Sequence, residues 1–380
     1  MVKIFIAGDV INCNNIDGKI CGPSLEKQIK SSDYAICNFE AAINNDCPPS
    51  RKSGPGIMQQ RGTVGALKQH GFDLLLLANN HIMDYGFNGL SLTQDAIDNE
   101  NLDYIGAGLT LEEAYKTKVI ELEGLKIGIV NACEAQFGAL DYSSEDTFGY
   151  AWINHRNINE MVRELSSKCD FVIFCVHAGL ENVSVPLTSW RERYKELCDV
   201  GVDVVVGSHP HVPQGYEKYN SSYIFYSLGN FFFDYDYAKT AENHSYSVEL
   251  EFNKEKGINF ALIHHKTTGK FVDICSDEVN VNLLNKYLSL GENEDYKNMI
   301  IETYESIVKP RLLGPPSFVN RIASFKNLPK EIIATLIGRR RKNISKLELY
   351  HFVRNETYHT VSVSALNIQS KLECGENNDK

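Results

Sequence analysis

The sequence Val206-Gly-Ser-His-Pro-His-Val212 places His209 and His211 two residues apart, directly after an apolar run that has the pattern of a buried strand. Histidine is the most common metal ligand in proteins. Sets that mix imidazoles with carboxylates favour transition metals such as Mn, Fe or Zn over Mg or Ca. Two interpretations of the pair are open from these residues: a metal site, or two solvated or hydrogen-bonded histidines in a loop.

Short apolar or β-branched runs recur along the first two thirds of the chain, with helical segments between many of them, which is typical of an α/β domain. Helices are expected over Arg61 to His70 and Thr188 to Val200, each stopped by a glycine, and Thr110-Leu-Glu-Glu113 has the pattern of a capping box. The expected strands are Val2 to Ala7, Tyr34 to Phe39, Asp73 to Ala78, Lys126 to Asn131, Asp170 to Val176, Asp203 to Val206 and Tyr223 to Tyr226.

Polar side chains able to bind metal or phosphate follow six of these seven runs. Ligand sites collect at the carboxyl ends of strands in open α/β sheets, so we expect these side chains to converge. Each alone has an ordinary alternative, such as a turn, a solvated carboxylate, a helix cap or a structural histidine. An accidental cluster would have to be solvated at one sheet edge for no purpose. The residues are Asp9, Glu40, Asn79-Asn80-His81, His177, His209 with His211, and Asn230.

Composition limits the classes of function. The 380 residues are 43% apolar and 23% charged, and a net charge of −11 argues against a general nucleic-acid binder, which needs concentrated Lys and Arg. The ten cysteines form no C-x-x-C motif, which predicts reduced thiols in an intracellular protein. Neither a charged leader nor a run of about 20 apolar residues occurs, so we expect a cytoplasmic protein without a transmembrane segment. No motif specifies the oligomeric state.

Six ordered motifs lie within about residues 1 to 265. They are Gly8-Asp9, Asn38-Phe-Glu40, Ala78-Asn-Asn-His-x-x-Asp84-x-Gly86-x-x-Gly89-Leu90, His177-x-x-x-Glu181, Gly207-Ser-His-Pro-His-Val-x-Gln-Gly215 and Tyr226-Ser-Leu-Gly-Asn-Phe231. Together they resemble the CapA family, named for capsule and poly-γ-glutamate synthesis proteins, within the calcineurin-like metallophosphoesterase superfamily.

The resemblance implies a four-layer α/β/β/α sandwich with a binuclear centre of two divalent transition metal ions, Mn, Fe or Zn. Phosphate ester hydrolysis by a metal-bridging hydroxide is the implied chemistry, because a metal pair can clamp a phosphoryl group during in-line displacement. His81 would be the catalytic histidine that contacts the leaving oxygen, and Asp84 would orient it. The implied metal ligands are Asp9, Glu40, Asn80, His177, His209 and His211.

One position departs from the superfamily pattern. Most members have Asp-x-His at the first motif, whereas Ile11 stands two residues after Asp9 and cannot bind metal. The metal on that side would then be held more weakly, completed by water or Asn12, or absent.

Three further residues are candidates for the substrate-binding region. Arg61 could hold a phosphate or carboxylate of the substrate, or simply be an exposed arginine at a helix start. Glu181, four residues after His177, could fix the tautomer of an imidazole ligand. Gly229-Asn230 could present N–H groups or an amide to substrate, or form a tight turn before Phe231.

The last hundred residues differ from the rest, because the strand pattern stops near Thr267 and helices are expected over Leu283 to Val308 and Ser317 to Phe352. We therefore expect a metallophosphoesterase domain over 1–266, a helical extension over 267–372 and a disordered tail over 373–380. The basic run Gly338-Arg-Arg-Arg-Lys342 is either a solvated face or a contact for a membrane surface, a polyanion or a partner.

The expected function is that of a CapA-type metal-dependent phosphoesterase, tied by family analogy to surface polysaccharide or capsule metabolism. Its substrate would be a phosphorylated small molecule, glycan or polymer. Two alternatives stay open: a non-hydrolytic accessory protein in capsule or poly-γ-glutamate assembly, and a degenerate, metal-free binding module favoured by Ile11.

Overall fold

A computed structural model describes residues 1–43, 47–52, 54–142, 144, 146–235, 244–268, 270–289, 291, 293–310 and 349–373. The described chain forms two compact units. One unit comprises Met1–Ser50 with Gly56–Ser289, and the other comprises Arg51–Pro55 with Leu290–Lys380. All the side chains expected at the strand ends belong to the first unit.

The first sheet has the strand order β16-β15-β14-β1-β2-β3-β4, with β13 paired to β1. Strands β13, β1, β2, β3 and β4 run parallel. On the edge of β1 opposite to β2, β13 pairs with the end of β1 and β14 pairs with its beginning, and β14, β15 and β16 continue the sheet as antiparallel strands. The bounds are β1 (Val2–Ile11), β2 (Tyr34–Phe39), β3 (Leu74–Leu76), β4 (Asp103–Ile105), β13 (Asn230–Phe233), β14 (His244–Asn253), β15 (Gly257–Thr268) and β16 (Phe271–Ile274).

The second sheet has the order β11-β12-β10-β9-β7-β6 and is also mixed. Strands β7, β9, β10 and β12 are parallel, and β6 and β11 are antiparallel strands at the two edges. The bounds are β6 (Lys118–Leu122), β7 (Leu125–Cys133), β9 (Phe171–His177), β10 (Val204–Ser208), β11 (Tyr216–Tyr219) and β12 (Ser222–Phe225). A short third ladder joins β5 (Ala107–Gly108) to β8 (Gly149–Tyr150).

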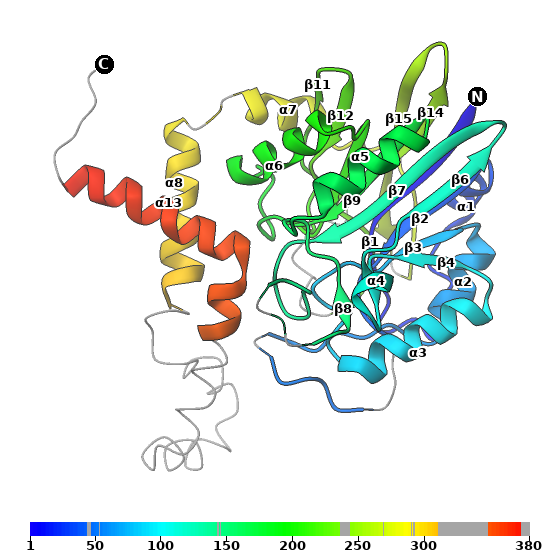
Figure 1. The fold of residues 1–380 in the computed structure, drawn as a ribbon, viewed down its shortest axis with the longest axis horizontal. Helices are drawn as coiled ribbons and strands as arrows, with labels where there is room; N and C mark the ends of the chain where they lie inside the picture. The colour runs from blue at the N-terminus through cyan, green and yellow to red at the C-terminus, as the bar shows by residue number, and fades with distance from the viewer. Residues whose placement is uncertain are drawn as a thin grey trace. The chain divides into compact units, whose positions relative to one another are not determined.

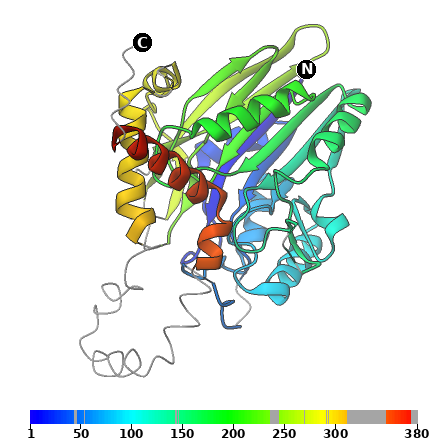
Figure 2. The same ribbon diagram turned by 60° about the vertical axis from the view of Figure 1, so that its left-hand side comes forward.

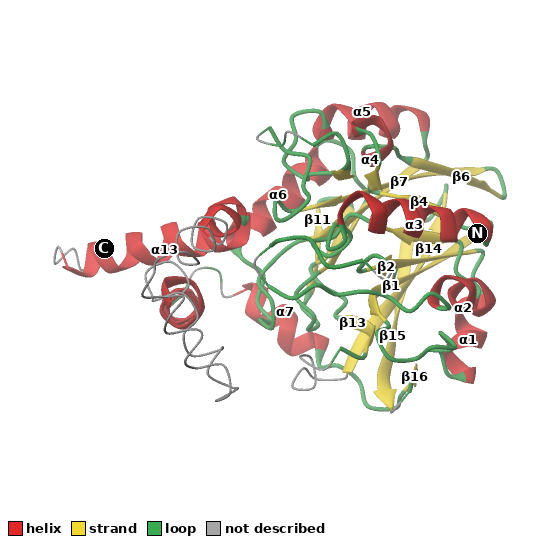
Figure 3. Ribbon diagram, turned by 90° about the horizontal axis from the view of Figure 1, so that it is seen from below, coloured by secondary structure: helices red, strands yellow, loops and turns green. Residues whose placement is uncertain are grey.

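The two sheets pack face to face through a shared apolar core, and helices cover their outer faces (Figures 1 and 3). Ile4 and Ile36 of the first sheet meet Ile129 and Val204 of the second in this core. Residues of β1 that point the other way, such as Phe5, pack with the helices α1 (Pro23–Lys30), α2 (Thr63–His70) and α3 (Gly86–Asn99). Helices α5 (Ile158–Lys168) and α6 (Thr188–Asp199) contact the second sheet. The predicted α/β/β/α sandwich is confirmed.

Local signals account for several element ends. Helix α2 stops at Gly71, which adopts the left-handed conformation with φ +99°. Helix α4 (Leu111–Ala114) begins at Thr110, whose side chain accepts a hydrogen bond from the Glu113 backbone N–H, as the predicted capping box requires. All seven expected strands are present, but β1 and β7 run further than expected, to Ile11 and Cys133.

Strands do not stop near Thr267 as expected, because β16 (Phe271–Ile274) closes a hairpin with β15. Helix α7 (Val281–Ser289) contacts β11 within the same unit. In the second unit, α8 (Glu294–Thr303) continues into a π-helical turn over Tyr304–Val308, and α13 (Glu356–Glu373) packs across α8 (Figure 2).

Several expectations fall outside the described residues. They concern most of the helix expected over 317–352, the basic run at 338–342 and the tail beyond residue 373. None of the described helices is both long enough and apolar enough to span a membrane.

Candidate metal centre

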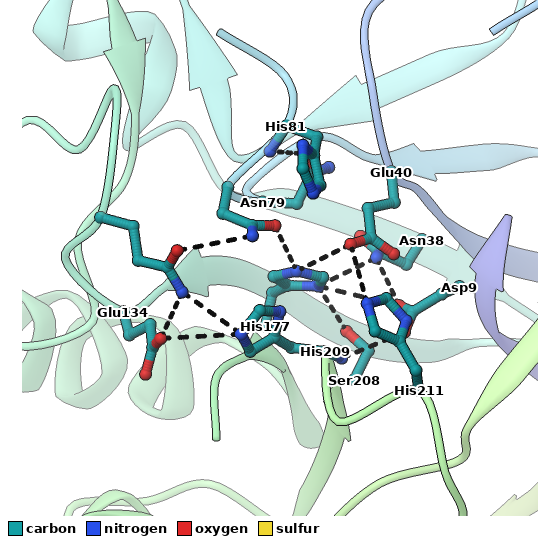
Figure 4. A network of polar contacts seen from close by, with 12 residues as sticks. Asp9, Asn38, Glu40, Asn79, His81, Glu134, His177, Ser208, His209 and His211 are labelled. Carbon is teal, nitrogen blue, oxygen red and sulfur yellow. Dashed lines mark hydrogen bonds and ion pairs between the residues drawn. The ribbon is translucent and has the colours of Figure 1, made fainter. Parts of the chain in front are cut away.

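Strands of both sheets deliver the candidate ligands to one place (Figure 4). Asp9 lies in β1, at a β-bulge between Asp9 and Val10, and Glu40 directly follows β2. Asn80 lies in the turn after β3, and His177 is the last residue of β9. His209 and His211 follow β10. These side chains, separated by up to about 200 positions, form one buried polar cluster.

Close backbone approach and unusual dihedral angles shape this cluster. A methyl group at Gly8 would lie 2.0 Å from the carbonyl oxygen of Gly229, so only glycine permits β1 to pass there. Ala41, His209 and His211 have φ values of +143°, +95° and +59°. Such conformations cost about 1–3 kcal/mol each and gather at functional sites. Backbone strain at His209 and His211 thus accompanies the orientation of their imidazoles toward the cluster.

The first possible metal position is formed by Glu40, His177 and His209, which offer ligand atoms within 4.8 Å of one another. His177 Nε2 lies 3.4 Å from Glu40 Oε1 and 3.1 Å from Asn80 Oδ1, which places the amide beside the same position. Ser208 Oγ lies 3.1 Å from His177 Nδ1. Asn38 Nδ2 lies 3.0 Å from the same nitrogen, so Nδ1 is engaged by these two contacts and Nε2 is the nitrogen that faces the metal position.

The second possible position is formed by Asp9, Glu40 and His211, so Glu40 belongs to both groups. His211 Nδ1 lies 3.4 Å from Asp9 Oδ2, and its Nε2 lies 3.8 Å from Glu40 Oε1. Ile11 is fully buried in an apolar cluster with Ala41 and Ile57. This group thus has three members, and Ile11, where the resemblance leads one to expect a histidine, packs among apolar side chains.

The Asn12 side chain has hydrogen-bond partners outside the two ligand groups. Its Nδ2 donates to Asn15 O and Thr63 Oγ1, and its Oδ1 accepts from the Asn15 backbone N–H. Both polar ends of the amide are engaged with the loop that leads to α2. The side chain thus holds that loop in this structure, and completion of the ligand set by Asn12 stays a prediction.

The electrostatics of the cluster suit cation binding. Burial raises the pKa of Glu40 to about 8, and the nearby Asp9 carboxylate acts in the same direction. Burial opposes the ionisation of Asp9, but His211, His177 and Asn38 outweigh it and lower the pKa of Asp9 to about 2. Burial also lowers the pKa of His177 to about 3. Burial opposes the charge of His211, but Glu40 and Asp9 outweigh it and raise the pKa of His211 to about 10. In the metal-free protein a protonated His211 therefore offsets the Asp9 charge, and a bound cation would take over this role.

Unpaired buried atoms test whether a metal fits. Within the described residues, both carboxylate oxygens of Glu40 and the Nδ1 atom of His209 are buried and have no hydrogen-bond partner. Leaving a buried acceptor unsatisfied costs about 1–3 kcal/mol, more for a charged group. These are the atoms that a divalent transition metal would coordinate, so the donor set fits such an ion.

His81 and Asp84 form a pair beside the ligands. His81 Nδ1 lies 2.8 Å from Asp84 Oδ2, and the same carboxylate oxygen accepts a 2.7 Å hydrogen bond from the Ile57 backbone N–H. Asp84 is fully buried, whereas the His81 side chain is 11% exposed. The predicted orientation of His81 by Asp84 thus has a matching contact.

The predicted substrate-binding residues are placed differently from one another. Arg61 lies exposed in the turn before α2. Glu181 is half-buried in the turn after β9. Against the effect of burial, Glu40 and Asp9 raise the pKa of His211, and Glu181 adds to them. Asn230 begins β13, and its Oδ1 lies 2.9 Å from His211 Nδ1. Its contact here is with an imidazole of the cluster, and contact with substrate stays a prediction.

Four residues of the network were not assigned roles from the sequence. Asn38 donates to Asp9 Oδ1 at 2.7 Å, and Ser208 contacts His177. Glu134 and Gln136 lie beside His209. Glu134 directly follows β7, so the rule that polar residues stand at strand ends would have found it if β7 had been predicted to reach Cys133.

Comparison with known proteins gives the relatives of this chain. It is 31% identical over 232 residues to the capsule biosynthesis protein CapA of Bacillus anthracis, an alignment that covers 59% of this chain and 56% of the relative. It is 31% identical over 234 residues to the PGA biosynthesis protein CapA of Bacillus subtilis, covering 60% of each. The chain thus spans less than two thirds of the length of these relatives.

Solved structures overlap with the chain at low sequence identity. A hypothetical protein from Thermus thermophilus aligns with a TM-score of 0.46 and 15% identity, over 70% of this chain and 100% of that chain. The NAD nucleotidase of Haemophilus influenzae aligns with a TM-score of 0.43 and 14% identity, over 76% of this chain and 61% of that chain.

A family model decides the assignment. The model described as bacterial capsule synthesis protein PGA_cap matches residues 3–235, which is more than half of the chain and includes every candidate ligand. The chain belongs to this PGA_cap family of bacterial capsule synthesis proteins.

Proposed function

We propose that this protein is a metal-dependent phosphoesterase that acts on a phosphorylated intermediate in the synthesis of a capsule or a related surface polymer. The observation that carries the proposal is the pair of ligand groups that share Glu40, with His81 beside them. The names of the two Bacillus relatives, which refer to capsule and PGA biosynthesis, support the polymer context.

Two divalent metals bound there would supply Lewis-acid activation of water and of a phosphoryl group. The shared carboxylate of Glu40 would hold both positions at a fixed separation. Neutral His177 and His209 would complete one side without adding charge, as metal binding by imidazole requires. Asp9 and His211 would complete the other side.

His81 is the proposed acid. Its Nδ1 faces the buried Asp84 carboxylate, so the other ring nitrogen is left to give a proton to the leaving oxygen. The hydrogen bond from the Ile57 N–H fixes the Asp84 carboxylate and hence the orientation of the ring. General acid catalysis of this kind contributes about 10²–10⁴-fold to the rate.

The test combines metal analysis with turnover. Purified protein would be reconstituted with Mn²⁺, its bound metal counted by mass spectrometry, and its hydrolysis of a chromogenic phosphomonoester and a phosphodiester measured beside His81→Ala. His70→Ala is a matched control, because His70 is also buried next to a carboxylate, that of Glu26. We expect bound metal in all three proteins and loss of turnover in His81→Ala alone. Equal turnover in His81→Ala and the wild type would contradict the role of His81.

A second candidate function is a non-hydrolytic accessory role in polymer assembly. It is favoured by Ile11, whose apolar cluster leaves the Asp9 and His211 side with fewer protein ligands. In that case the protein would bind metal and show no turnover on any phosphoester. An absence of bound metal would contradict both candidates.

A further inference from the structure

A buried carboxylate outside the ligand groups faces one of the ligands. Glu134 follows β7 and is fully buried. Its Oε1 lies 3.7 Å from His209 Nε2, on the side of the ring opposite to the unpaired Nδ1. The Glu134 side chain also accepts hydrogen bonds from Gln136 Nε2 and, at 3.4 Å, from the Gly179 backbone N–H.

The contacts of the two ring nitrogens favour one of the two tautomers of His209. A proton on Nδ1 would be a buried donor without an acceptor among the described residues, which costs about 1–3 kcal/mol. A proton on Nε2 instead faces Glu134 Oε1 at the ion-pair distance of 3.7 Å. In the other tautomer Nε2 could accept from Gln136 Nε2 at 3.2 Å, but the proton would then sit on Nδ1, the atom without an acceptor. A metal bound at Nδ1 requires the Nε2-protonated form. The Nε2-protonated form leaves the Nδ1 lone pair directed away from Glu134.

Glu134 reaches a second ligand through Gln136. Gln136 Nε2 donates to Glu134, and Gln136 Oε1 accepts from Asn80 Nδ2 at 3.4 Å. With its NH₂ group held in this way, Asn80 turns its Oδ1 toward His177 Nε2. The amide oxygen of Asn80 and the Nδ1 of His209 therefore both depend on where Glu134 sits.

The turn that carries Glu134 is itself anchored. Tyr150 is fully buried, its hydroxyl donates to the backbone oxygen of Glu134 at 3.1 Å, and it accepts from the backbone N–H of Gln136 at 2.9 Å. A buried hydroxyl that bridges both ends of a three-residue turn restricts its movement. This is a built support and not a chance contact of a surface side chain.

We propose that Glu134 is a positioning residue, which orients His209 directly and Asn80 through Gln136 toward the metal position next to Glu40 and His177. The inference rests on the metal site of the proposed function. Carboxylates that hold a ligand imidazole through its second nitrogen commonly raise metal affinity, and their loss costs about 10–100-fold.

Isothermal titration of EDTA-treated protein with Mn²⁺ tests this proposal. Glu134→Ala is expected to weaken one metal site about 10–100-fold, and the nearly isosteric Glu134→Gln by about 10-fold, because an amide offers its single oxygen to only one of the two donors. Asp203→Ala is the matched control. It removes a carboxylate that accepts the Val172 N–H at the other end of β10, so metal affinity should not change.

A spectroscopic readout separates positioning from general loss of structure. Nitrogen NMR of ¹⁵N-histidine-labelled, metal-free protein should report His209 protonated at Nε2, with its signal assigned from His209→Gln. In Glu134→Gln the Nδ1-protonated form should gain population. Metal affinity and tautomer unchanged in both Glu134 variants, with metal bound by the wild type, would overturn this inference alone. No metal bound by the wild type would overturn the proposed function as well.

Discussion

Replacing Glu40 by glutamine should stabilise the metal-free protein and destabilise the metal-loaded one. Glu40 is fully buried, and neither carboxylate oxygen has a hydrogen-bond partner in the described structure. Burial and the Asp9 charge raise its pKa to about 8 from an ordinary value of 4.5. The unfolded chain therefore releases this proton before the folded protein does, and folding stability falls as pH rises from 4.5 toward 8.

The size of the effect follows from the pKa shift. One pH unit in this window corresponds to about 1.4 kcal/mol for a single proton. About two units above the ordinary pKa, near pH 6.5, the wild type has lost about 3 kcal/mol that Glu40→Gln keeps, because an amide does not ionise. The variant should therefore match the wild type near pH 4.5 and exceed it by about 3 kcal/mol near pH 6.5, both in EDTA.

With Mn²⁺ bound, the wild type should instead be more stable than Glu40→Gln. An ion that binds only the folded state at about 1,000 times its Kd stabilises the wild type by about 4 kcal/mol. Glu40→Gln lacks the carboxylate shared by both ligand groups, so it should gain far less. Urea unfolding followed by far-ultraviolet circular dichroism, in EDTA and in Mn²⁺ at about pH 6.5, measures both differences.

The variant Glu249→Gln tests whether removing the charge of any buried carboxylate has the same effect. Glu249 is also buried, but it accepts from Lys3 Nζ at 3.0 Å and Gln28 Nε2 at 2.7 Å. Glu249→Gln should therefore lose stability with or without Mn²⁺. If Glu40→Gln were less stable than the wild type in EDTA at the same pH, the description of Glu40 as a buried carboxyl group without a hydrogen-bond partner would be refuted.

Three further predictions concern other side chains. Asp84→Asn should lower phosphoester turnover by about 10²–10⁴-fold with metal content unchanged, because His81 loses its charged partner; unchanged turnover would argue against the pair. Ile11→His should tighten Mn²⁺ binding on the His211 side in calorimetric titration and lower metal-free stability by about 1–3 kcal/mol; unaltered affinity would show that position 11 does not face the metal. Burial lowers the pKa of His265 to about 3 from 6.5, so the free energy of unfolding falls as pH falls below 6.5. Between about pH 6.5 and 5, urea unfolding should show that His265→Gln loses about 2 kcal/mol less stability than the wild type. Parallel pH profiles of the two proteins would exclude this.

The sequence predicts the convergence of the candidate ligands well because the signal of each is local. His209 and His211 follow a β-branched run, and Glu40 and His177 stand at the ends of apolar runs whose strand character is plain. Parallel strands bring such ends together whatever lies between them. Convergence of residues about 200 positions apart thus followed from the strand pattern alone.

The residues that support the ligands could not be predicted in the same way. Asn131 resembles a strand end, yet it lies inside β7, where its side chain accepts from the Ala78 N–H and donates to Cys175 O. Both contacts join residues that are far apart in the sequence, so no local sequence pattern predicts them. Ending the strand at Asn131 concealed Glu134, which stands at the true end of β7.

The Ile11 departure shows the same limit. The sequence reveals that a ligand is missing, but whether Asn12 replaces it depends on side-chain contacts with Asn15 and Thr63, and these contacts form only in the folded chain. The hairpin of β15 and β16 was missed for a related reason, since β16 is a short edge strand stabilised by its partner.

The central claim is that this strand-end cluster holds metal at two positions that share Glu40. Anomalous X-ray diffraction from crystals of the Mn²⁺-loaded protein tests it most directly. We predict one peak bounded by Glu40, Asn80, His177 and His209, and a second, of equal or lower occupancy, bounded by Asp9, Glu40 and His211. An anomalous map without a peak at Glu40, from crystals grown in saturating Mn²⁺, would contradict the account.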